Sequence, residues 1–457
     1  MTEHAFDLVV LGGGSGGYAA AIRAAELGSR VALIERDKVG GTCLHRGCIP
    51  TKALLHVAEI ADTVRHAADA GVLAEWNGID GERMRAFREG IVAKKHKGLQ
   101  SLLSARGITT VTGEGRLEPD RRVRVGDDVY VGANVVIATG ASSRSLPGVE
   151  IGGRILTSDQ ALDLAEPPSR AVILGGGVIG VEFASLWRSL GADVTIVEAL
   201  DHLVPAEDIT LSKALERAFR KRGIAFHLGV RFQEATQTDD SVTVVLEDGT
   251  TLEADALLVA VGRTPATSGL GLEDAGVELD RGFVVVDERL RTGAPGVWAV
   301  GDIVPGLQLA HRGFQQGIFV AEEIAGLNPT VVPDRIVPRV TYSDPELASV
   351  GLTQTQAEAE HGADAILCTE FNLAGNARSE ILGATGLVKV VRIADGPVVG
   401  VHLIGARVGE LITEGQIAVA WEAHPEDIAP YVHAHPTQGE ALGEAFLALA
   451  GKPLHAL

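Results

Sequence analysis

Two closely spaced cysteines are the first residues of this sequence whose type and spacing could do chemistry. Cys43 and Cys48 lie in the segment GGTCLHRGCIPTKALL, residues 40–55. A thiol at a helix N-terminus ionises easily and is reactive, and Pro50 favours a helix that starts near Cys48. A regular helix would separate the two Cα atoms by about 7.5 Å, beyond the ~7 Å that a disulfide can bridge. A disulfide therefore needs a bent turn, which Gly47 could supply; the alternative is two buried, reduced thiols, because cytosolic disulfides are rare.

A histidine and an acid near the C-terminus form a second candidate pair. In HAHPTQGEALGEAF, residues 433–446, His435 precedes a proline and is expected to be extended. Thr437 could cap the following helix, with Glu440 as its capping-box partner. By spacing alone, the segment predicts a helix start and nothing more. His433 is expected to be a surface histidine, and the lone Cys368 is expected to pack in the core.

An internal repeat organises the elements that must position these residues. Residues 9–35 align without a gap with residues 172–198, which lie 163 positions later. Each copy has an apolar run, a glycine turn, a helical stretch and a second apolar run, which predicts strand, turn, helix and strand. The GxGxxG pattern in each turn follows a strand and opens a helix, the context typical of dinucleotide binding.

The three glycines of such a turn have different tasks. The first makes the sharp turn, the second lets a pyrophosphate touch the backbone, and the third lets the helix pack on the strand. The helix N-terminus then offers free N–H groups to the phosphates. The glycines are Gly12, Gly14 and Gly17 in the first copy, and Gly175, Gly177 and Gly180 in the second.

Each copy ends its second strand with an acid, Glu35 or Glu198. A carboxylate there can accept hydrogen bonds from the ribose hydroxyls and would repel a 2′-phosphate, so Glu198 favours NAD over NADP. The alternative is that both are solvated acids. Two such sites suggest a flavin and a nicotinamide dinucleotide that exchange electrons, but the glycines do not say which copy holds which.

Composition excludes several classes of protein. The 457 residues carry a net charge of −20, which argues against a nucleic-acid partner because phosphate binding needs a basic face. No apolar run approaches the ~18 residues of a membrane helix, and the polar segment 1–7 is not a signal peptide. Three cysteines are too few for a secreted disulfide scaffold. We therefore expect a cytoplasmic protein with no bound metal.

The chain closely resembles the class I pyridine nucleotide–disulfide oxidoreductases along essentially its whole length, most specifically in residues 40–55. Within that family, it is similar to members that oxidise protein-bound dihydrolipoyl groups with NAD⁺ through a redox-active disulfide and FAD. This resemblance implies a homodimer. It also implies lipoyl domains of 2-oxoacid dehydrogenase or glycine cleavage complexes, and their acyltransferase (E2) core, as partners.

The implied fold class is α/β, with two Rossmann-like dinucleotide-binding domains and a C-terminal α+β dimerisation domain. Strand and helix patterns from about residue 336 onward agree with such a third domain. The expected boundaries are 1–149 and 267–335 for the FAD-binding domain, 150–266 for the NAD-binding domain, and 336–457 for the dimerisation domain.

The resemblance also assigns roles at the redox centre. Cys43 would exchange with the substrate, and Cys48 would lie against the flavin as the charge-transfer thiolate. Lys52 would lie near the flavin N5 and pair with Glu182. The alternative for this last pair is two solvated helix charges.

The HPTxxE motif resembles the acid/base pair of the family. His435 would take a proton from the incoming dithiol, and Glu440 would orient its ring. In the family, this histidine reaches the cysteine pair of the other subunit.

The same resemblance extends to the cofactor contacts, through VWAVGD (297–302) and LQLAHRGFQQG (307–317) among other motifs. The expected cofactor-binding residues are Gly12, Gly14, Gly17, Glu35, Gly41, Thr42, Lys52, Gly115, Thr139, Gly140, Gly175, Gly177, Gly180, Glu198, Gly262, Asp302, Leu309, Ala310 and His311. The chain departs from the family pattern at His45-Arg46, Ala266, Arg312-Gly313 and Gln316. These departures bear on flavin tuning and substrate contacts.

Three other functions remain open at this point. A reductase of a soluble disulfide such as glutathione or mycothiol usually takes NADPH, yet Glu198 is followed by no basic residue in Ala199 and Leu200. A flavoenzyme that passes electrons from NADH to quinones or metal ions would leave Cys43 and His435 idle. A non-catalytic scaffold would need neither pair.

Overall fold

The computed structural model describes residues 2–455, and the chain folds into two compact units. Unit 1 comprises Met1–Leu54, Asp80–Arg144 and Gly262–Asp334. Unit 2 comprises Leu55–Ile79, Ser145–Val261 and Arg335–Leu457. Each unit contains one copy of the internal repeat.

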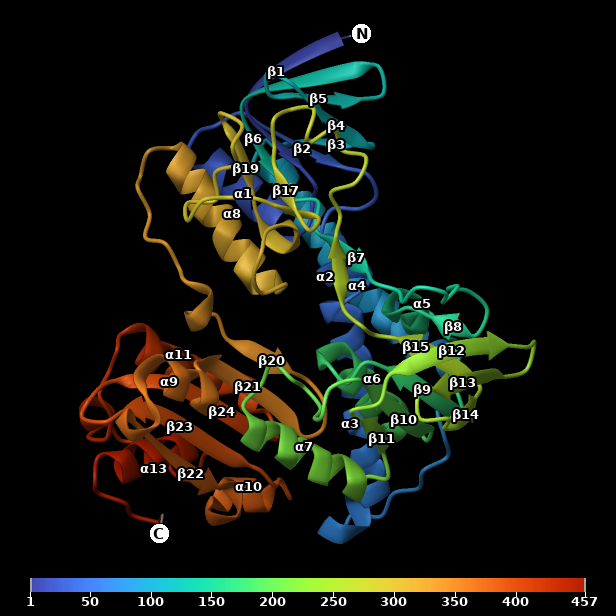
Figure 1. The fold of residues 1–457 in the computed structure, drawn as a ribbon, viewed down its shortest axis with the longest axis vertical. Coiled ribbons are helices and arrows are strands. Elements are labelled where there is room, and N and C mark those ends of the chain that lie inside the picture. Colours follow the sequence, from blue (N-terminus) through green and yellow to red (C-terminus); the bar gives the residue numbers. More distant parts are fainter. Residues whose placement is uncertain (1, 456–457) are drawn as a thin grey trace. The chain divides into compact units, whose positions relative to one another are not determined.

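Unit 1 is built on a seven-stranded sheet in the order β3-β2-β1-β6-β5-β4, with β19 paired to β6 (Figure 1). Strands β1, β2, β3, β6 and β19 run parallel, and β4 and β5 are antiparallel additions. The strands are β1 (Thr2–Leu11), β2 (Val31–Glu35), β3 (Thr109–Thr112), β4 (Gly115–Glu118), β5 (Arg122–Val125), β6 (Asp128–Ile137) and β19 (Val297–Ala299). Two ribbons complete the unit, β7 (Ala141–Ser143) with β16 (Arg263–Pro265) and β17 (Leu279–Asp280) with β18 (Phe283–Val284).

Both faces of this sheet are buried, which explains why its central strands are apolar without alternation. Leu8, Val10 and Leu33 lie in one core cluster with residues of α1 and α8, whereas Val9 and Ile34 lie in the other, with residues of segment 270–304. The helices are α1 (Ser15–Glu26), α2 (Gly41–His45), α4 (Gly81–Ala105) and α8 (Ala310–Ile324). Helix α3 (Cys48–His66) begins in unit 1 and ends in unit 2.

Unit 2 holds the second repeat in a parallel sheet of order β11-β10-β9-β15-β8. Its strands are β8 (Ile155–Leu156), β9 (Arg170–Leu174), β10 (Asp193–Glu198), β11 (Ala225–Leu228) and β15 (Ala256–Val259). An antiparallel sheet is formed by β12 (Phe232–Gln237), β13 (Val242–Leu246) and β14 (Thr251–Ala254). The helices of this part are α5 (Ser158–Leu162), α6 (Val178–Ser189) and α7 (Ile209–Lys221).

The C-terminal part of unit 2 is an antiparallel sheet of order β20-β21-β24-β23-β22, with helices packed on it (Figure 1). Its strands are β20 (Arg339–Thr341), β21 (Glu346–Gly351), β22 (Ile366–Asn372), β23 (Leu387–Ile393) and β24 (Val398–Gly405). Its helices are α9 (Gln354–His361), α10 (Ala377–Ile381), α11 (Ile412–Ala420), α12 (Pro425–Ile428) and α13 (Glu440–Leu449). The predicted α/β fold class is confirmed, whereas the expected domain boundaries stay a prediction.

Candidate active site

The two glycine turns have the same backbone geometry. Gly12 and Gly175 both have φ +105°, a left-handed conformation that side chains rarely adopt. A Cβ on Gly17 would lie 1.8 Å from the carbonyl oxygen of Gly12, and one on Gly180 would lie 1.9 Å from the equivalent oxygen. The first and third glycines of each turn are therefore required by the protein's own packing.

The second glycine of each turn has no such internal reason. A Cβ on Gly14 would come no closer than 3.9 Å to another atom, and one on Gly177 would meet open space. Each lies at the N-cap of its helix, α1 or α6, where N–H groups are exposed for an anion. These two positions therefore fit the place where a cofactor pyrophosphate would touch the backbone.

The strand-end acids fold back on their own turns. Glu35 accepts the backbone N–H of Gly13 at 2.7 Å and that of Asp37 at 2.9 Å. Glu198 accepts the N–H of Gly176 at 2.6 Å and the N–H two residues after itself at 2.9 Å. The same arrangement in both copies holds each carboxylate beside its glycine turn, where ribose hydroxyls would meet it. The alternative of a solvated acid is wrong for Glu198, which is only 9% exposed.

Unit 1 has two further features that bear on cofactor binding. A pocket of about 540 Å³ opens beside Glu35, between β3 and α4. Asp302 follows β19, and burial raises the pKa of its carboxyl against the positive charges of Arg263 and Arg312. A largely buried carboxyl of this kind suits a hydroxyl-bearing chain as its partner. The residues present therefore fit FAD at the first turn.

The loops around that site are held by backbone contacts. The Thr139 hydroxyl donates to the carbonyl of Ala266 at 2.8 Å, and the N–H of Ala266 donates to the carbonyl of Gly140 at 2.8 Å. Both contacts use only the backbone of Ala266, so this departure from the family pattern leaves them intact. Gly262 has φ +113°, whereas Gly115 is a packing position, because its Cβ would lie 2.5 Å from Leu11.

The start of α8 contains the expected Leu309, Ala310 and His311, with Leu309 at the N-cap. Gln316, one of the departures, accepts the backbone N–H of Gly301 at 2.7 Å. An amide oxygen makes this contact as a carboxylate would, but without a negative charge. Arg312 donates to the Asp334 carboxylate at 2.6 Å and to the Pro305 carbonyl at 2.6 Å, and so holds the loop after Asp302.

The bend expected before the cysteine helix is present. Helix α2 ends at His45, Gly47 lies in a bend, and α3 begins at Cys48. The bend brings the two thiols together: a hydrogen bond to Cys48, together with burial, raises the pKa of the Cys43 thiol. The charge of Lys52 acts in the opposite direction, which places its ammonium near the pair.

One neighbour of the cysteine pair was not expected from the sequence. Burial, followed by the charges of Cys43 and Cys48, raises the pKa of Tyr18 to about 12, so this phenol lies near the thiols. The only signal in the sequence is that Tyr18 directly follows the third glycine of the turn. His45 contacts the Val39 carbonyl at 3.0 Å and the ring of His96 at 4.9 Å between centroids.

Glu182 is held inside unit 2. It is 3% exposed and accepts the backbone N–H of Tyr342 at 2.9 Å, so the alternative of a solvated helix charge is wrong for it. Ser185, one turn further along α6, accepts the N–H of Asp344 at 2.9 Å. Because Lys52 belongs to unit 1, its pairing with Glu182 stays a prediction.

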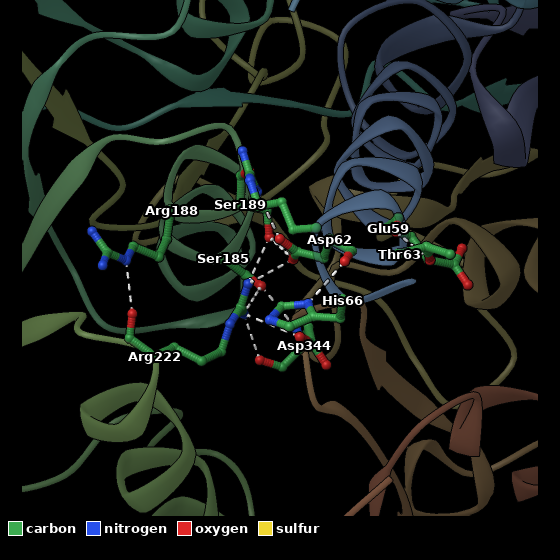
Figure 2. A network of polar contacts seen from close by, with 10 residues as sticks. Glu59, Asp62, Thr63, His66, Ser185, Arg188, Ser189, Arg222 and Asp344 are labelled. Atoms are coloured by element: carbon green, nitrogen blue, oxygen red, sulfur yellow. Dashed lines mark hydrogen bonds and ion pairs between the residues drawn. The ribbon is translucent and has the colours of Figure 1, made fainter. Parts of the chain in front are cut away.

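A polar network continues along the same face of α6 (Figure 2). Arg222 donates to the hydroxyls of Ser185 at 2.7 Å and Ser189 at 2.6 Å. The Ser189 hydroxyl in turn donates to the Asp62 carboxylate of α3 at 2.5 Å. The network ties the second half of α3 to α6 within unit 2.

The C-terminal pair is in hydrogen-bond contact. His435 Nδ1 lies 2.8 Å from Glu440 Oε1, and the other carboxylate oxygen accepts the N–H of Thr437 at 2.7 Å. The capping-box alternative is half right, because Glu440 makes this contact while the Thr437 hydroxyl donates to the Ala434 carbonyl. The side chain of His435 is 73% exposed and that of Glu440 25%, so the imidazole is accessible and its partner is sheltered.

His433 corrects an expectation. Its side chain is only 19% exposed and pairs with Glu414, so it is not a surface histidine. Cys368 lies half-buried in β22, and burial raises the pKa of its thiol to about 11, which fits an unreactive packing role. Within residues 2–455, no helix is long and apolar enough to cross a membrane, and no cluster of His, Cys, Asp and Glu could hold a metal ion.

The chain is similar to known proteins along nearly its whole length. A dihydrolipoyl dehydrogenase from Bacillus subtilis (strain 168) is 38% identical over 98% of this chain and 99% of its own length. The crystal structure of LpdA from Mycobacterium tuberculosis has a TM-score of 0.90 at 30% identity, over 98% of this chain and 100% of that one. The HOCl-induced flavoprotein disulfide reductase RclA from Escherichia coli, in its Cu(II) complex, has a TM-score of 0.88 at 29% identity, over 97% and 99%.

Two family models cover most of the sequence. The model described as pyridine nucleotide-disulphide oxidoreductase matches residues 6–317, and the dimerisation domain of that family matches residues 337–446. With the doubled glycine turn and the cysteine pair in one chain, this protein belongs to the pyridine nucleotide–disulphide oxidoreductase family.

Proposed function

We propose that this protein oxidises protein-bound dihydrolipoyl groups with NAD⁺, using FAD and the Cys43–Cys48 pair. The observation that carries the proposal is the contact between these two thiols across the bend at Gly47. A pair so placed is suited to cycle between disulfide and dithiol. The identity of 38% to a dihydrolipoyl dehydrogenase over nearly the full length supports the choice of substrate.

Thiol–disulfide exchange is the step that this chain's own residues perform. In the proposed mechanism, His435 takes a proton from one thiol of the dihydrolipoyl group, and Glu440 stabilises the resulting imidazolium. The thiolate attacks Sγ of Cys43 in the Cys43–Cys48 disulfide, forms a mixed disulfide and releases Cys48 as a thiolate. The second lipoyl thiol then displaces Cys43, closes the lipoyl disulfide and passes its proton to the leaving Cys43 sulfur, so the substrate is oxidised and the cysteine pair is left reduced.

The glycine turns determine where the cofactors would be held. The first turn, with Glu35 and Asp302, would hold FAD, and the second turn, with Glu198, would hold NAD. Bound there, the two cofactors supply the redox chemistry that carries two electrons from the dithiol to NAD⁺. Tyr18 of α1 lies near the cysteine pair, and Lys52 supplies a positive charge that favours a thiolate.

The dimerisation domain completes the proposed site. The protein is a homodimer through residues 337–446, and we propose that His435 of one subunit serves the cysteine pair of the other. The exposed side chains of Trp421, Tyr431 and Val432 lie near this histidine in the chain and are suited to burial in such an interface. We further propose that the protein acts in the cytoplasm, with lipoyl domains of a 2-oxoacid dehydrogenase or glycine cleavage complex and the E2 core as partners.

An anaerobic titration tests this function. Dihydrolipoamide is added to the flavin-loaded protein while its absorption spectrum is recorded, and NAD⁺ is added afterwards. We expect a long-wavelength charge-transfer band that disappears when NAD⁺ is added. Fast turnover with NADPH and glutathione disulfide, and none with dihydrolipoamide, would contradict the proposal.

Two cysteine variants separate this function from electron transfer to quinones or metal ions. Cys43→Ser is expected to abolish lipoamide-linked NAD⁺ reduction while NADH-driven quinone reduction continues. Cys368→Ser is the matched control, because it removes a half-buried thiol of unit 2, and it should change neither activity. Equal loss of both activities in Cys43→Ser would count against a role for the pair in thiol exchange.

A further inference from the structure

A second histidine–carboxylate pair lies beside the first. The Nε2 of His433 is 2.8 Å from Oε1 of Glu414, and the two side chains are 19% and 37% exposed. Glu414 belongs to α11, whereas His433 precedes α13. The pair therefore joins α11 to the segment that carries His435.

The ring of His433 lies against the first turn of α13. A Cβ on Gly443 would come within 2.5 Å of Nδ1 of His433, and one on Gly439 would come within 3.8 Å of its Cδ2. These two glycines lie one residue before and three residues after Glu440, on the turn that carries this acid. Their lack of side chains leaves room for the imidazole there.

The two pairs act on each other electrostatically. The hydrogen bond to Glu414, together with the charges of Glu414 and Glu440, raises the pKa of His433. Burial alone would raise the pKa of Glu440, but the Thr437 N–H, His435 and the charge of His433 outweigh it and lower that pKa. The ring of His433 thus faces Glu414 from α11 and Glu440 from α13, and His435 lies two residues along its own segment.

A third pair on α13 provides a matched comparison. His455 Nδ1 lies 2.8 Å from Oε1 of Glu444, one turn beyond Glu440 on α13. It has the same chemistry and the same distance as the His433 pair, but it does not join α11 to α13. Its side chain is 66% exposed.

We propose that His433 and Glu414 form a positioning pair for His435 and Glu440: they hold the first turn of α13 and place a positive charge beside the acid that orients the base. This inference rests on the proposed function, because it assigns a task to the same proton-transfer site. His433 touches no substrate in this scheme and acts only through Glu440.

The sign of the effect follows from charge. A protonated His433 partly neutralises the negative charge of Glu440. It therefore disfavours a second positive charge on His435. Removing that charge should make His435 a stronger base, so it would hold its proton to higher pH. The acidic limb of kcat/KM for dihydrolipoamide should then move to higher pH by about half a unit, the size expected for one charge a few ångströms away near a protein surface.

Variants of the two pairs test the proposal in the flavin-loaded homodimer, with the pH profile of NAD⁺ reduction by dihydrolipoamide as the readout. His433→Gln should shift the acidic limb upward, and the double variant with Glu414→Gln should shift it no further, because it also removes the carboxylate that His433→Gln leaves without its partner. His433→Lys should restore the original profile, because it returns the charge without the ring. His455→Gln should leave the profile where it is.

Flavin content and the melting temperature of each variant show whether it is folded. If His433→Gln is folded and keeps the original profile, the positioning role is wrong although the proposed function stands. An equal shift in His455→Gln would also overturn it, because the effect would then be general to charges near α13. If the unaltered protein does not oxidise dihydrolipoamide at any pH, the proposed function itself has failed.

Discussion

The backbone N–H of Tyr342 donates to the carboxylate of Glu182 at 2.9 Å, which ties α6 to the segment between β20 and β21. Ser185, one turn on, receives the N–H of Asp344 from the same segment. Helix α6 begins at the second glycine turn, so these bonds anchor the helix whose N-terminus is proposed to hold NAD. The polar face of α6 is therefore buried against another segment and stabilises the position of the helix, and it is not a solvated surface.

Arg222 is expected to be hard to replace, even by lysine. Its guanidinium reaches Ser185, Ser189 and the carbonyl of Asp344 at 2.6–2.7 Å, an arrangement that one ammonium cannot reproduce (Figure 2). Arg222→Lys should lower the free energy of unfolding by about 1–3 kcal/mol, because at least one buried hydroxyl loses a partner. Urea unfolding measures this, with Arg281→Lys as an exposed control that should show no change.

The glycines of the second turn should separate packing from cofactor binding. Gly180→Ala places a Cβ 1.9 Å from the Gly175 carbonyl oxygen, so it should destabilise the protein by about 1–3 kcal/mol and raise KM for NAD⁺. Gly177→Ala meets open space in the protein, so it should leave the melting temperature unchanged and still raise KM for NAD⁺. An unchanged KM in Gly177→Ala would mean that no phosphate approaches this backbone.

The buried pair of Lys389 and Asp208 should make stability depend on acid pH. Burial alone would raise the pKa of Asp208, but bonds from the Gln354 N–H, Lys389 and the Thr210 N–H lower it to about 2. The contribution of this carboxylate, about 2 kcal/mol, is complete above pH 4 and is lost as the pH falls towards 2. Urea unfolding at several pH values should show a smaller loss over this range for Asp208→Asn than for the unaltered protein.

Gln316 should influence the flavin through its lack of charge. Gln316→Glu keeps an oxygen that can accept the Gly301 N–H but adds a negative charge near Asp302. That charge should disfavour the added electron density of a reduced flavin, so the flavin reduction potential should fall. An anaerobic redox titration measures it; Gln316→Leu, which removes the acceptor without adding charge, should not lower the potential in the same way.

Local requirements made the glycine turns and the cysteine bend predictable from the sequence. The left-handed φ of Gly12 and the start of a helix at Cys48 both depend on residues close by in the sequence. The spacing of a motif therefore predicts them directly. The strand-end acids were predictable for the same reason, since Glu35 and Glu198 bond to their own turns.

Contacts between distant segments could not be read in this way. Glu414 and His433 are joined because α11 and α13 pack on one sheet, and nothing in the spacing of residues 414 and 433 indicates this. Likewise, the position of Tyr18 after the glycine turn and that of Arg222 after α7 do not reveal their partners, which come from other parts of the chain. The capping-box spacing at Thr437 was misleading in part. The Thr437 hydroxyl does not cap the helix, because it donates a hydrogen bond to the Ala434 carbonyl within the turn at residues 434–437.

The folded-back acids have a consequence for affinity. Glu35 and Glu198 are each restrained by two backbone N–H groups of the protein itself, so their rotamer freedom is lost when the chain folds. An incoming adenosine therefore meets a preorganised receptor and bears little of that entropic penalty. Tight binding of a dinucleotide would then depend on the hydrogen bonds within each β–α–β unit as much as on the atoms that contact the ligand.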